Sequence, residues 1–338
     1  MIEGKLGLGS KRTTEQSGVA LFIALLMVAT LSFIAIGVTE TMTLSAKRTG
    51  ASNSRAQIFW RAVSAEVVVR TALERVLGEQ DSQSPLTLTH PLFLGPIDIP
   101  LPDGTATIQF FDGTRCFNLN SLTPSNSPSD ESGPVRELKL LMETLGAPSS
   151  TADKTAAVII DWIDDDPIPT ISGAEDNFYS ALPSPYRTGG GALASVSEIR
   201  AMDGIGIALY RQLSEYLCVA ADRKPMKINV NMLLPAHAPL LVALTNGAIT
   251  ISQAQEVLAD RPPEGWTTTE AFWSNPVLAE TPLSDEEKSA RTAINSSYIE
   301  ARATVEFDGI SIEQRLTYQI SGGNNALRLL SRQLGEGI

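Results

Sequence analysis

The stretch Gly18-Val-Ala-Leu-Phe-Ile-Ala-Leu-Leu-Met-Val-Ala-Thr-Leu-Ser-Phe-Ile-Ala-Ile-Gly-Val38 decides how this 338-residue chain begins to fold. Its roughly twenty apolar residues are enough to cross a bilayer as a helix, at about 1.5 Å per residue. Lys5, Lys11 and Arg12 precede it, which indicates a cytoplasmic N-terminus. A cleavable secretory signal carries its small residue after the apolar run, whereas Gly18 comes before it. A polar leader can therefore be removed while the apolar helix remains on the mature protein.

The helical pattern continues well beyond the apolar stretch and predicts one helix over residues 19–77, with Gly78 as its stop. Apolar positions of the second half recur at three- and four-residue steps: Ile58/Phe59, Ala62/Val63, Val69, Leu73 and Val76/Leu77. The other face carries Glu66, Arg70, Glu74 and Arg75. The second half therefore packs one face on a globular head. A separate soluble helix would instead require a break near Gly37 or Gly50.

The composition bounds the partners and the compartment. The formal net charge of −12 argues against a nucleic-acid partner, because phosphate binding needs clustered Lys and Arg. The chain has two cysteines, Cys116 and Cys218. In an exported protein this count indicates one disulfide, closing a loop of roughly a hundred residues. Two unpaired buried thiols are the alternative.

Strand patterns flank a central block of helical patterns. Strands are expected at 86–92 and 105–111, with turns at Asp103-Gly104 and Asp112-Gly113. A polar linker covers residues 123–133, and residues from Gly322 form a mobile tail. Helices are expected at 135–145, 152–164, 197–202, 207–217, 235–244 and 252–259, and a hairpin at 298–307 and 310–320 around Asp308-Gly309. The order predicts an α+β fold, in which the strands complete one antiparallel sheet and the helical block is inserted between them.

Several motifs together resemble one family. They are Cys116-Phe-Asn-Leu-Asn120, Asp161-Trp-Ile-Asp-Asp-Asp-Pro-Ile-Pro-Thr-Ile-Ser-Gly-Ala-Glu-Asp-Asn-Phe-Tyr179, Pro185-Tyr-Arg187, Ser197-Glu-Ile-Arg200 and Ile228-Asn-Val-Asn231. With the N-terminal segment, which resembles the class III signal of type IV pilins and pseudopilins, they look like the minor pseudopilin K family of the type II secretion system. The alternative for the N-terminal segment alone is a plain signal anchor with an accidental glycine.

The resemblance implies a role in protein export. A prepilin peptidase would cut between Gly18 and Val19 and methylate the new N-terminus. The subunit would sit at the tip of the pseudopilus with the I- and J-type minor pseudopilins, prime assembly on an inner-membrane platform, and help to push folded proteins through the outer-membrane secretin. It would be a single-pass inner-membrane protein with a periplasmic globular part.

The resemblance also implies how the chain is divided. The expected parts are a leader (1–18), a transmembrane and amphipathic helix (19–77), the first part of a pilin-like sheet (78–122), an inserted all-helical domain (123–292), a terminal hairpin of the sheet (293–322) and a flexible tail (323–338).

The fifth mature position, Ile23, lacks the glutamate of most pilins. In pilin fibres this carboxylate is thought to neutralise the terminal ammonium of a neighbouring subunit, and without that partner it would be costly in lipid. An isoleucine therefore suits a subunit with nothing above it. The other reading is a membrane anchor without a fibre role.

A cluster of acidic residues is the candidate metal site. Six carboxylates fall within residues 161–176, a segment without lysine or arginine. Oxygen ligands on a loop bent by Pro and Gly suit calcium, which accepts six to eight oxygens in flexible geometry. The resemblance adds that the helical domain of the family binds structural calcium here. The expected ligands are Asp164, Asp166, Glu175 and Asp176, followed by Asp161 and Asn177; the alternative is a solvated acidic loop.

Other chemistry has little support. The two histidines, His90 and His237, have no zinc-type spacing, and no Gly-x-Ser-x-Gly elbow is present. The stretch Asp203-Gly-Ile-Gly206 resembles a helix-hairpin-helix that grips DNA, but acidic residues surround it. A glycine turn that packs two helices is the favoured interpretation. The DNA-binding interpretation defines the alternative function, a minor pilin of a type IV pilus or DNA-uptake system.

Overall fold

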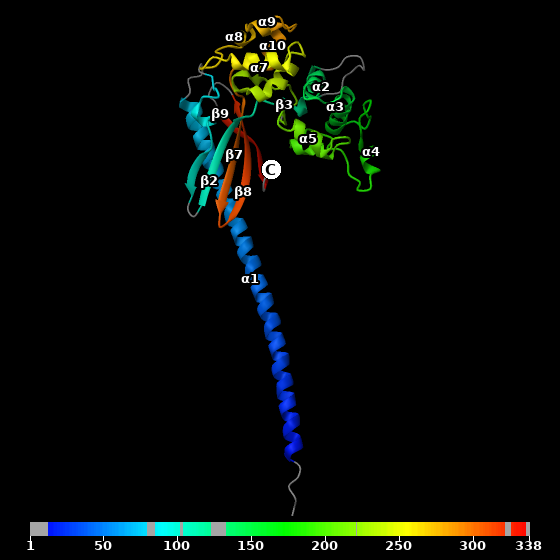
Figure 1. The fold of residues 1–338 in the computed structure, drawn as a ribbon, viewed down its shortest axis with the longest axis vertical. Helices are drawn as coiled ribbons and strands as arrows, with labels where there is room; N and C mark the ends of the chain where they lie inside the picture. The colour runs from blue at the N-terminus through cyan, green and yellow to red at the C-terminus, as the bar shows by residue number, and fades with distance from the viewer. Residues whose placement is uncertain are drawn as a thin grey trace, which may run out of the picture.

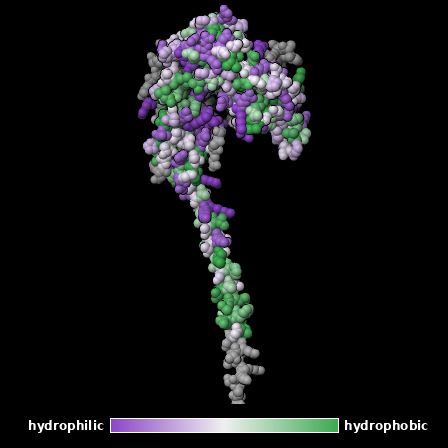
Figure 2. Space-filling model, in the orientation of Figure 1, coloured by the Kyte–Doolittle hydropathy of each residue, from purple (hydrophilic) through white to green (hydrophobic). Residues whose placement is uncertain are grey.

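The computed structural model describes residues 13–79, 85–101, 104–122, 133–220, 222–321 and 326–335. A single helix, α1 (Thr13–Glu79), forms a long rod that carries the rest of the chain at one end (Figure 1). It runs through Gly37 and Gly50 without a break, so the predicted continuous helix is confirmed. Hydrophobic side chains gather over the free part of the rod, where residues 19–53 are exposed (Figure 2).

The upper part of α1 packs on a five-stranded antiparallel sheet. The buried face of α1 consists of Ile58, Ala62, Ala65, Val69, Leu73 and Leu77. The strand order is β1 (Ile97–Leu101), β2 (Gly104–Asp112), β7 (Tyr298–Phe307), β8 (Ile310–Ser321) and β9 (Ala326–Gly335). Because β2 pairs with β7, strands from the two ends of the head complete one sheet, as the sequence predicts.

The β7–β8 hairpin lies where the sequence places it. Phe307 pairs with Ile310, and Asp308 (φ 51°) and Gly309 (φ 72°) form the two-residue turn. Two positive φ angles are the requirement of a type I′ turn, which explains the Asp-Gly pair.

Two predictions about the sheet are wrong. Residues 86–92 form no strand: Pro91 starts a 3₁₀ turn (Pro91–Phe93) and His90 Nδ1 accepts the amide of Leu92, while the apolar side chains fill the core below the rod. The expected mobile tail instead contributes β9 over residues 326–335. Arg332 donates to both carboxylate oxygens of Glu66 on α1, at 2.7 and 2.9 Å, which holds this strand on the rod. Asp103 and residues 123–132 of the predicted linker lie outside the described residues.

A helical region is inserted between β2 and β7 and caps one end of the sheet (Figure 1). Its helices are α2 (Gly133–Thr144), α3 (Ser149–Ile163), α4 (Asp176–Ser180), α5 (Ile207–Leu213), α6 (Ala238–Leu244), α7 (Ile251–Ala259), α8 (Thr269–Trp273), α9 (Pro276–Ala279) and α10 (Asp285–Arg291). Residues 196–201 form a 3₁₀ helix rather than an α-helix. One core cluster runs through the whole region.

The helical region has two halves, residues 117–220 and 228–293, and a small parallel sheet closes each half. β3 (Phe117–Asn118) pairs with β4 (Leu217–Cys218), and β5 (Ile228–Asn229) pairs with β6 (Thr292–Ala293). The helix predicted over 207–217 therefore ends at Leu213, and Cys218 lies on a strand instead of ending a helix. The cysteines form a disulfide, with 5.7 Å between the Cα atoms of Cys116 and Cys218.

Each half begins with the same asparagine clasp. Asn120 Nδ2 donates to the carbonyl oxygens of Leu193 and Ala220, at 3.0 and 2.9 Å, and its Oδ1 accepts the amide of Leu193. Asn231 makes the same bonds to Trp266, donating from Nδ2 at 2.9 Å and accepting at Oδ1 at 2.8 Å. Both asparagines are buried. Because a buried amide without partners is costly, these bonds fix distant loops against the first turn of each half.

Candidate metal centre

Three acidic residues converge where α3 ends and α4 begins. Asp161 lies in the last turn of α3, Asp164 is the residue after that helix, and Glu175 precedes the first turn of α4. The loop between them folds back, so that one carboxylate oxygen of each residue lies within 4.8 Å of the others. The site is on the part of the helical region that extends sideways from the sheet (Figure 1).

The loop returns to α3 through a close contact at Gly173. Thr170 donates its backbone amide to both oxygens of Asp161, at 3.0 and 3.2 Å, and Asp161 is only 1% exposed. A Cβ atom on residue 173 would collide with Oδ2 of Asp161 and would lie 2.5 Å from the Thr170 hydroxyl. Only glycine therefore allows the loop to approach the carboxylate this closely.

The cluster holds carboxylate oxygens without partners. Asp164 Oδ1 and Glu175 Oε1 are buried and have no hydrogen bond within the described residues. Arg223, whose charge acts on Asp164, donates its Nη2 to the carbonyl of Ile163. Buried oxygens without donors are expensive unless a cation satisfies them. Three convergent carboxylates of this kind fit a divalent, oxygen-seeking cation.

The electrostatics point the same way. Burial, with the neighbouring charges of Asp161 and Asp164, raises the pKa of Glu175 to about 7. Burial, with the charge of Asp166 as the next cause, raises the pKa of Asp164 to about 6. The pKa of Asp161 is also raised by burial. Each shift means that the ionised cluster is unfavourable as long as no positive charge sits among its oxygens.

The remaining predicted ligands lie around this centre. Asp166 is exposed, and its Oδ1 accepts the amide of Ile168 at 2.9 Å. Asp176 turns toward Thr188, from which its Oδ1 accepts the amide and the hydroxyl, and these bonds lower the pKa of Asp176. Asn177 is exposed on α4. The structure thus brings together Asp161, Asp164 and Glu175.

Gly173 is a residue of the candidate site that the sequence analysis did not single out. The signal available was a glycine within the acidic loop, next to Ser172, which adopts a positive φ of 69°. Aromatic residues pack beside the acidic cluster, where α3 and α4 meet. The ring of Tyr179 lies 5.3 Å from that of Trp162 and 5.2 Å from that of Tyr186. These contacts hold α4 against α3 and so fix the distance between Glu175 and Asp161.

The raised pKa values predict a strong pH dependence of metal binding. A cation displaces protons, so the affinity of the cluster for a divalent cation should be greatest above pH 7 and should fall as the pH drops through 7 and then 6. Two competing protons weaken binding by on the order of 100-fold at pH 5.5 relative to pH 8. Without the cation, the stability of the fold depends on pH in the opposite sense. The folded state binds these two protons more tightly than the unfolded chain, so the stabilisation is complete below the ordinary pKa values of 3.8 and 4.5 and is lost as the pH rises from there to about 6 and 7.

Calorimetric titration at pH 5.5, 6.5 and 8, in buffers of different ionisation enthalpy, measures the affinity and the protons released. An affinity that does not change with pH would contradict the assignment of these carboxylates.

The predicted processing site lies on the rod. Gly18 is part of α1, Val19 is exposed, and Ile23 is 47% exposed in the apolar stretch. Among the described residues, α1 is the one helix long and apolar enough to cross a membrane.

Comparisons with known proteins connect these features. Two models of the family described as type II secretion system, protein K, match residues 115–222 and 228–293. The chain is 32% identical over 329 residues to the type II secretion system protein K of Pectobacterium carotovorum subsp. carotovorum, covering 95% of this chain and 97% of that protein.

The chain belongs to the type II secretion system protein K family.

Further similarities agree with this assignment. The protein K of Klebsiella pneumoniae is 33% identical over 271 residues, covering 79% of this chain and 82% of that protein. A chain of the crystal structure of the GspK–GspI–GspJ complex from the type 2 secretion system of enterotoxigenic Escherichia coli superposes with a TM-score of 0.74. It is 27% identical and covers 86% of this chain and 100% of that chain. As a member of the protein K family, the chain is a pseudopilin, a structural protein rather than an enzyme. Its long apolar N-terminal helix is consistent with anchoring in the inner membrane.

Proposed function

We propose that this chain is the minor pseudopilin at the tip of a type II secretion pseudopilus. It assembles with I- and J-type minor pseudopilins, primes the growth of the pseudopilus on the inner-membrane platform, and helps to move folded proteins through the outer-membrane secretin. The observation that carries this proposal is the likeness to a chain of the solved GspK–GspI–GspJ complex over the whole length of that chain. Ile23 supports the tip position, because a subunit with no neighbour above it gains nothing from a carboxylate in lipid.

The proposal includes the maturation and topology of the chain. A prepilin peptidase removes residues 1–18 by cutting between Gly18 and Val19, and the new N-terminus is methylated. Residues 19–77 form the membrane and rod helix, with the N-terminus in the cytoplasm and the head in the periplasm. Residues 78–122 and 293–322 contribute to the sheet, and residues 123–292 form the inserted domain. The convergent carboxylates of Asp161, Asp164 and Glu175 support a structural calcium ion in that domain.

The test is assembly with the two partners. The full-length chain in detergent micelles, mixed with purified I- and J-type pseudopilins and calcium, should elute as one ternary complex in size-exclusion chromatography. Omission of either partner should shift the elution. Separate elution of this chain from both partners in calcium would contradict the tip assignment, whereas an intact N-terminus in the mass spectrum of the native protein would contradict only the processing step.

The alternative is a minor pilin of a type IV pilus or DNA-uptake system, for which the Gly204 turn gave the motif. Gly204 (φ 80°) lies between the 3₁₀ helix of residues 196–201 and α5, and the neighbouring Asp203 pairs with Lys154 at 2.7 Å. This ion pair engages Lys154 beside the turn and places a carboxylate there, which disfavours the approach of a phosphate. Binding of DNA by the full chain at low salt, lost at high salt, would favour the alternative.

A further inference from the structure

The helical region is attached to the sheet by two neighbouring chain segments. The chain leaves the sheet after Asp112, the last residue of β2, and returns through Ser296 just before β7. Asp112 pairs with Ile299, so both segments lie at the same end of the sheet. These two connecting segments are called the crossings below. Because they lie side by side, they would act as a hinge between the sheet and the helical region unless other contacts fix the angle between the two parts.

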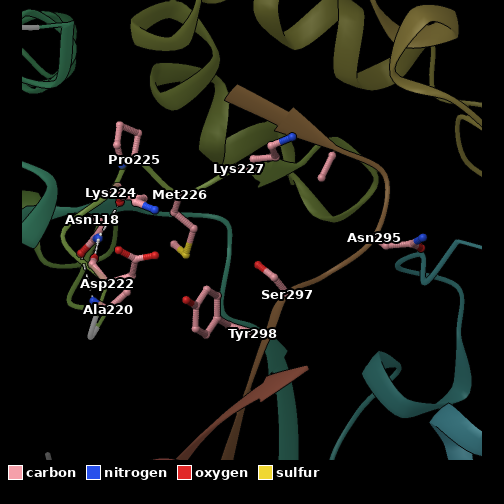
Figure 3. Close-up of a pocket in the computed structure, with 11 residues that line it drawn as sticks. Asn118, Ala220, Asp222, Lys224, Pro225, Met226, Lys227, Asn295, Ser297 and Tyr298 are labelled. Carbon is pink, nitrogen blue, oxygen red and sulfur yellow. Dashed lines mark hydrogen bonds between the residues drawn. The ribbon is translucent and has the colours of Figure 1, made fainter. Parts of the chain in front are cut away.

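Side-chain packing does not fix this angle on every side. A cavity of roughly 190 Å³ lies beside the two segments, lined by Asn118, Asp222, Met226, Asn295, Ser297 and Tyr298 (Figure 3). Its walls come from β3, from the connection between the two halves of the helical region, and from the segment that leads into β7. Atoms that line a void lack contact partners on that side. The orientation therefore depends on contacts outside this void. One of them is between β9 and the helical region, where Gln333 Nε2 donates to the carbonyl oxygen of Ala194 at 3.5 Å. The others lie beside the two connecting segments.

A buried carboxylate supplies them at the end of β2. Asp112 is 4% exposed and accepts three hydrogen bonds: from the Thr114 amide at 2.7 Å, from the Thr114 hydroxyl at 2.5 Å, and from the Ser296 hydroxyl. Asp112 and Thr114 belong to the outgoing segment and Ser296 to the returning one. Burial raises the pKa of Asp112, whereas these hydrogen bonds lower it. The carboxylate thus depends on its donors being in place.

The same groups reach into the helical region. Asn229, on β5, is buried; its Nδ2 donates to the Ser296 hydroxyl at 3.0 Å and its amide donates to the Thr114 hydroxyl at 3.2 Å. Asn229 Oδ1 accepts the amide of Asn231, which holds the loop at Trp266. Hydrogen bonds therefore run without interruption from the sheet to the core of the second half.

We propose that Asp112, Thr114, Ser296 and Asn229 form a junction latch that fixes the orientation of the helical region on the sheet, so that α1 and the helical region move as one rigid body. Rotation about the two crossings would separate Ser296 from Asp112 or Asn229 and leave buried polar groups without partners. The latch does not depend on the proposed place of the chain in the pseudopilus.

The test measures the spread of distances between the sheet and the helical region. Spin labels attached to p-acetylphenylalanine at residues 306 and 255, both exposed in the native chain, report one distance from β7 to α7 by pulsed electron resonance. The labels avoid the cysteines, and the full-length chain is used in micelles. We expect Ser296→Ala and Asp112→Ala each to broaden the distance distribution at least twofold while the circular dichroism spectrum stays that of the folded protein.

The matched control is Asp98→Ala. Asp98 is also a carboxylate of the sheet that accepts from a threonine, Thr107, at 2.7 Å, but it is exposed. It lies on the edge strand β1 opposite Thr107, which is five positions before Asp112 on β2. This variant should keep the wild-type distribution. Folded Ser296→Ala protein with a distribution as narrow as that of wild type overturns the latch. Should Asp112→Ala not fold, Ser296→Ala decides, because it removes one hydroxyl and leaves both strands and the carboxylate in place.

Discussion

Replacing Gly173 with alanine is expected to weaken calcium binding at least 100-fold. The new methyl group would overlap Oδ2 of Asp161 and crowd the Thr170 hydroxyl, so the loop cannot stay where it holds Glu175 beside Asp161. Alanine adds no charge and removes none, which separates this variant from the loss of a ligand. Isothermal titration calorimetry with calcium, on the full-length chain in micelles at pH 8, measures this affinity.

Gly206→Ala is the matched control for this experiment. Gly206 lies in the same region at the start of α5, with an ordinary φ of −75°, and a Cβ there meets nothing within 4 Å. Its affinity for calcium should stay within about threefold of wild type. Glu175→Gln, which keeps the side-chain shape, should lose binding as completely as Gly173→Ala. Calcium binding by Gly173→Ala that matches the control would show that the ion does not use this cluster.

Removal of the disulfide, by changing both Cys116 and Cys218 to serine, should lower the free energy of unfolding by about 2–5 kcal/mol. The bridge joins residues 102 apart in the sequence and so restricts a large part of the unfolded chain. It also holds β3 and β4 together at the closure of the first half of the helical region. Guanidinium unfolding followed by tryptophan fluorescence reports this region, because Trp162, Trp266 and Trp273 are buried in its core.

Reduction provides the internal control. Wild-type protein treated with a thiol reductant should unfold at the same denaturant concentration as the double serine variant, and the reductant should leave the variant unchanged. Equal midpoints for oxidised wild type and the variant would mean that the bridge contributes nothing to stability.

The elements predicted best were those whose pattern is long or local. The α1 rod follows from an unbroken apolar run that turns into a three- and four-residue repeat, and no tertiary contact is needed to recognise it. The β7–β8 hairpin follows from alternation on both sides of Asp308-Gly309, because the turn chemistry fixes the register locally.

The two wrong predictions about the sheet have the same cause, which is that both segments are placed by contacts distant in sequence. Residues 86–92 alternate like a strand, but Pro91 offers no amide to a neighbouring strand and the apolar side chains fill a gap under α1 instead. Strand β9 was predicted to be a tail because its sequence offers little to bury, and none of its leucines is fully buried in the structure. Its side-chain contact with α1, between Arg332 and Glu66, joins residues far apart in sequence. Short windows contain no information about such partners.

Three features could be predicted from the order of the residues alone: the apolar rod, the helical block inserted between sheet strands, and the acidic segment in which a cation could bind. Each depends on composition or spacing along the chain. The folded chain was needed to show that the carboxylates of Asp161, Asp164 and Glu175 converge, and that Asp176 turns to Thr188. It also decided that Asp112 meets Ser296, 184 residues away. The physical reason is that the distances and orientations of these side chains are set only once the acidic loop has folded against α3 and the chain has returned to the sheet.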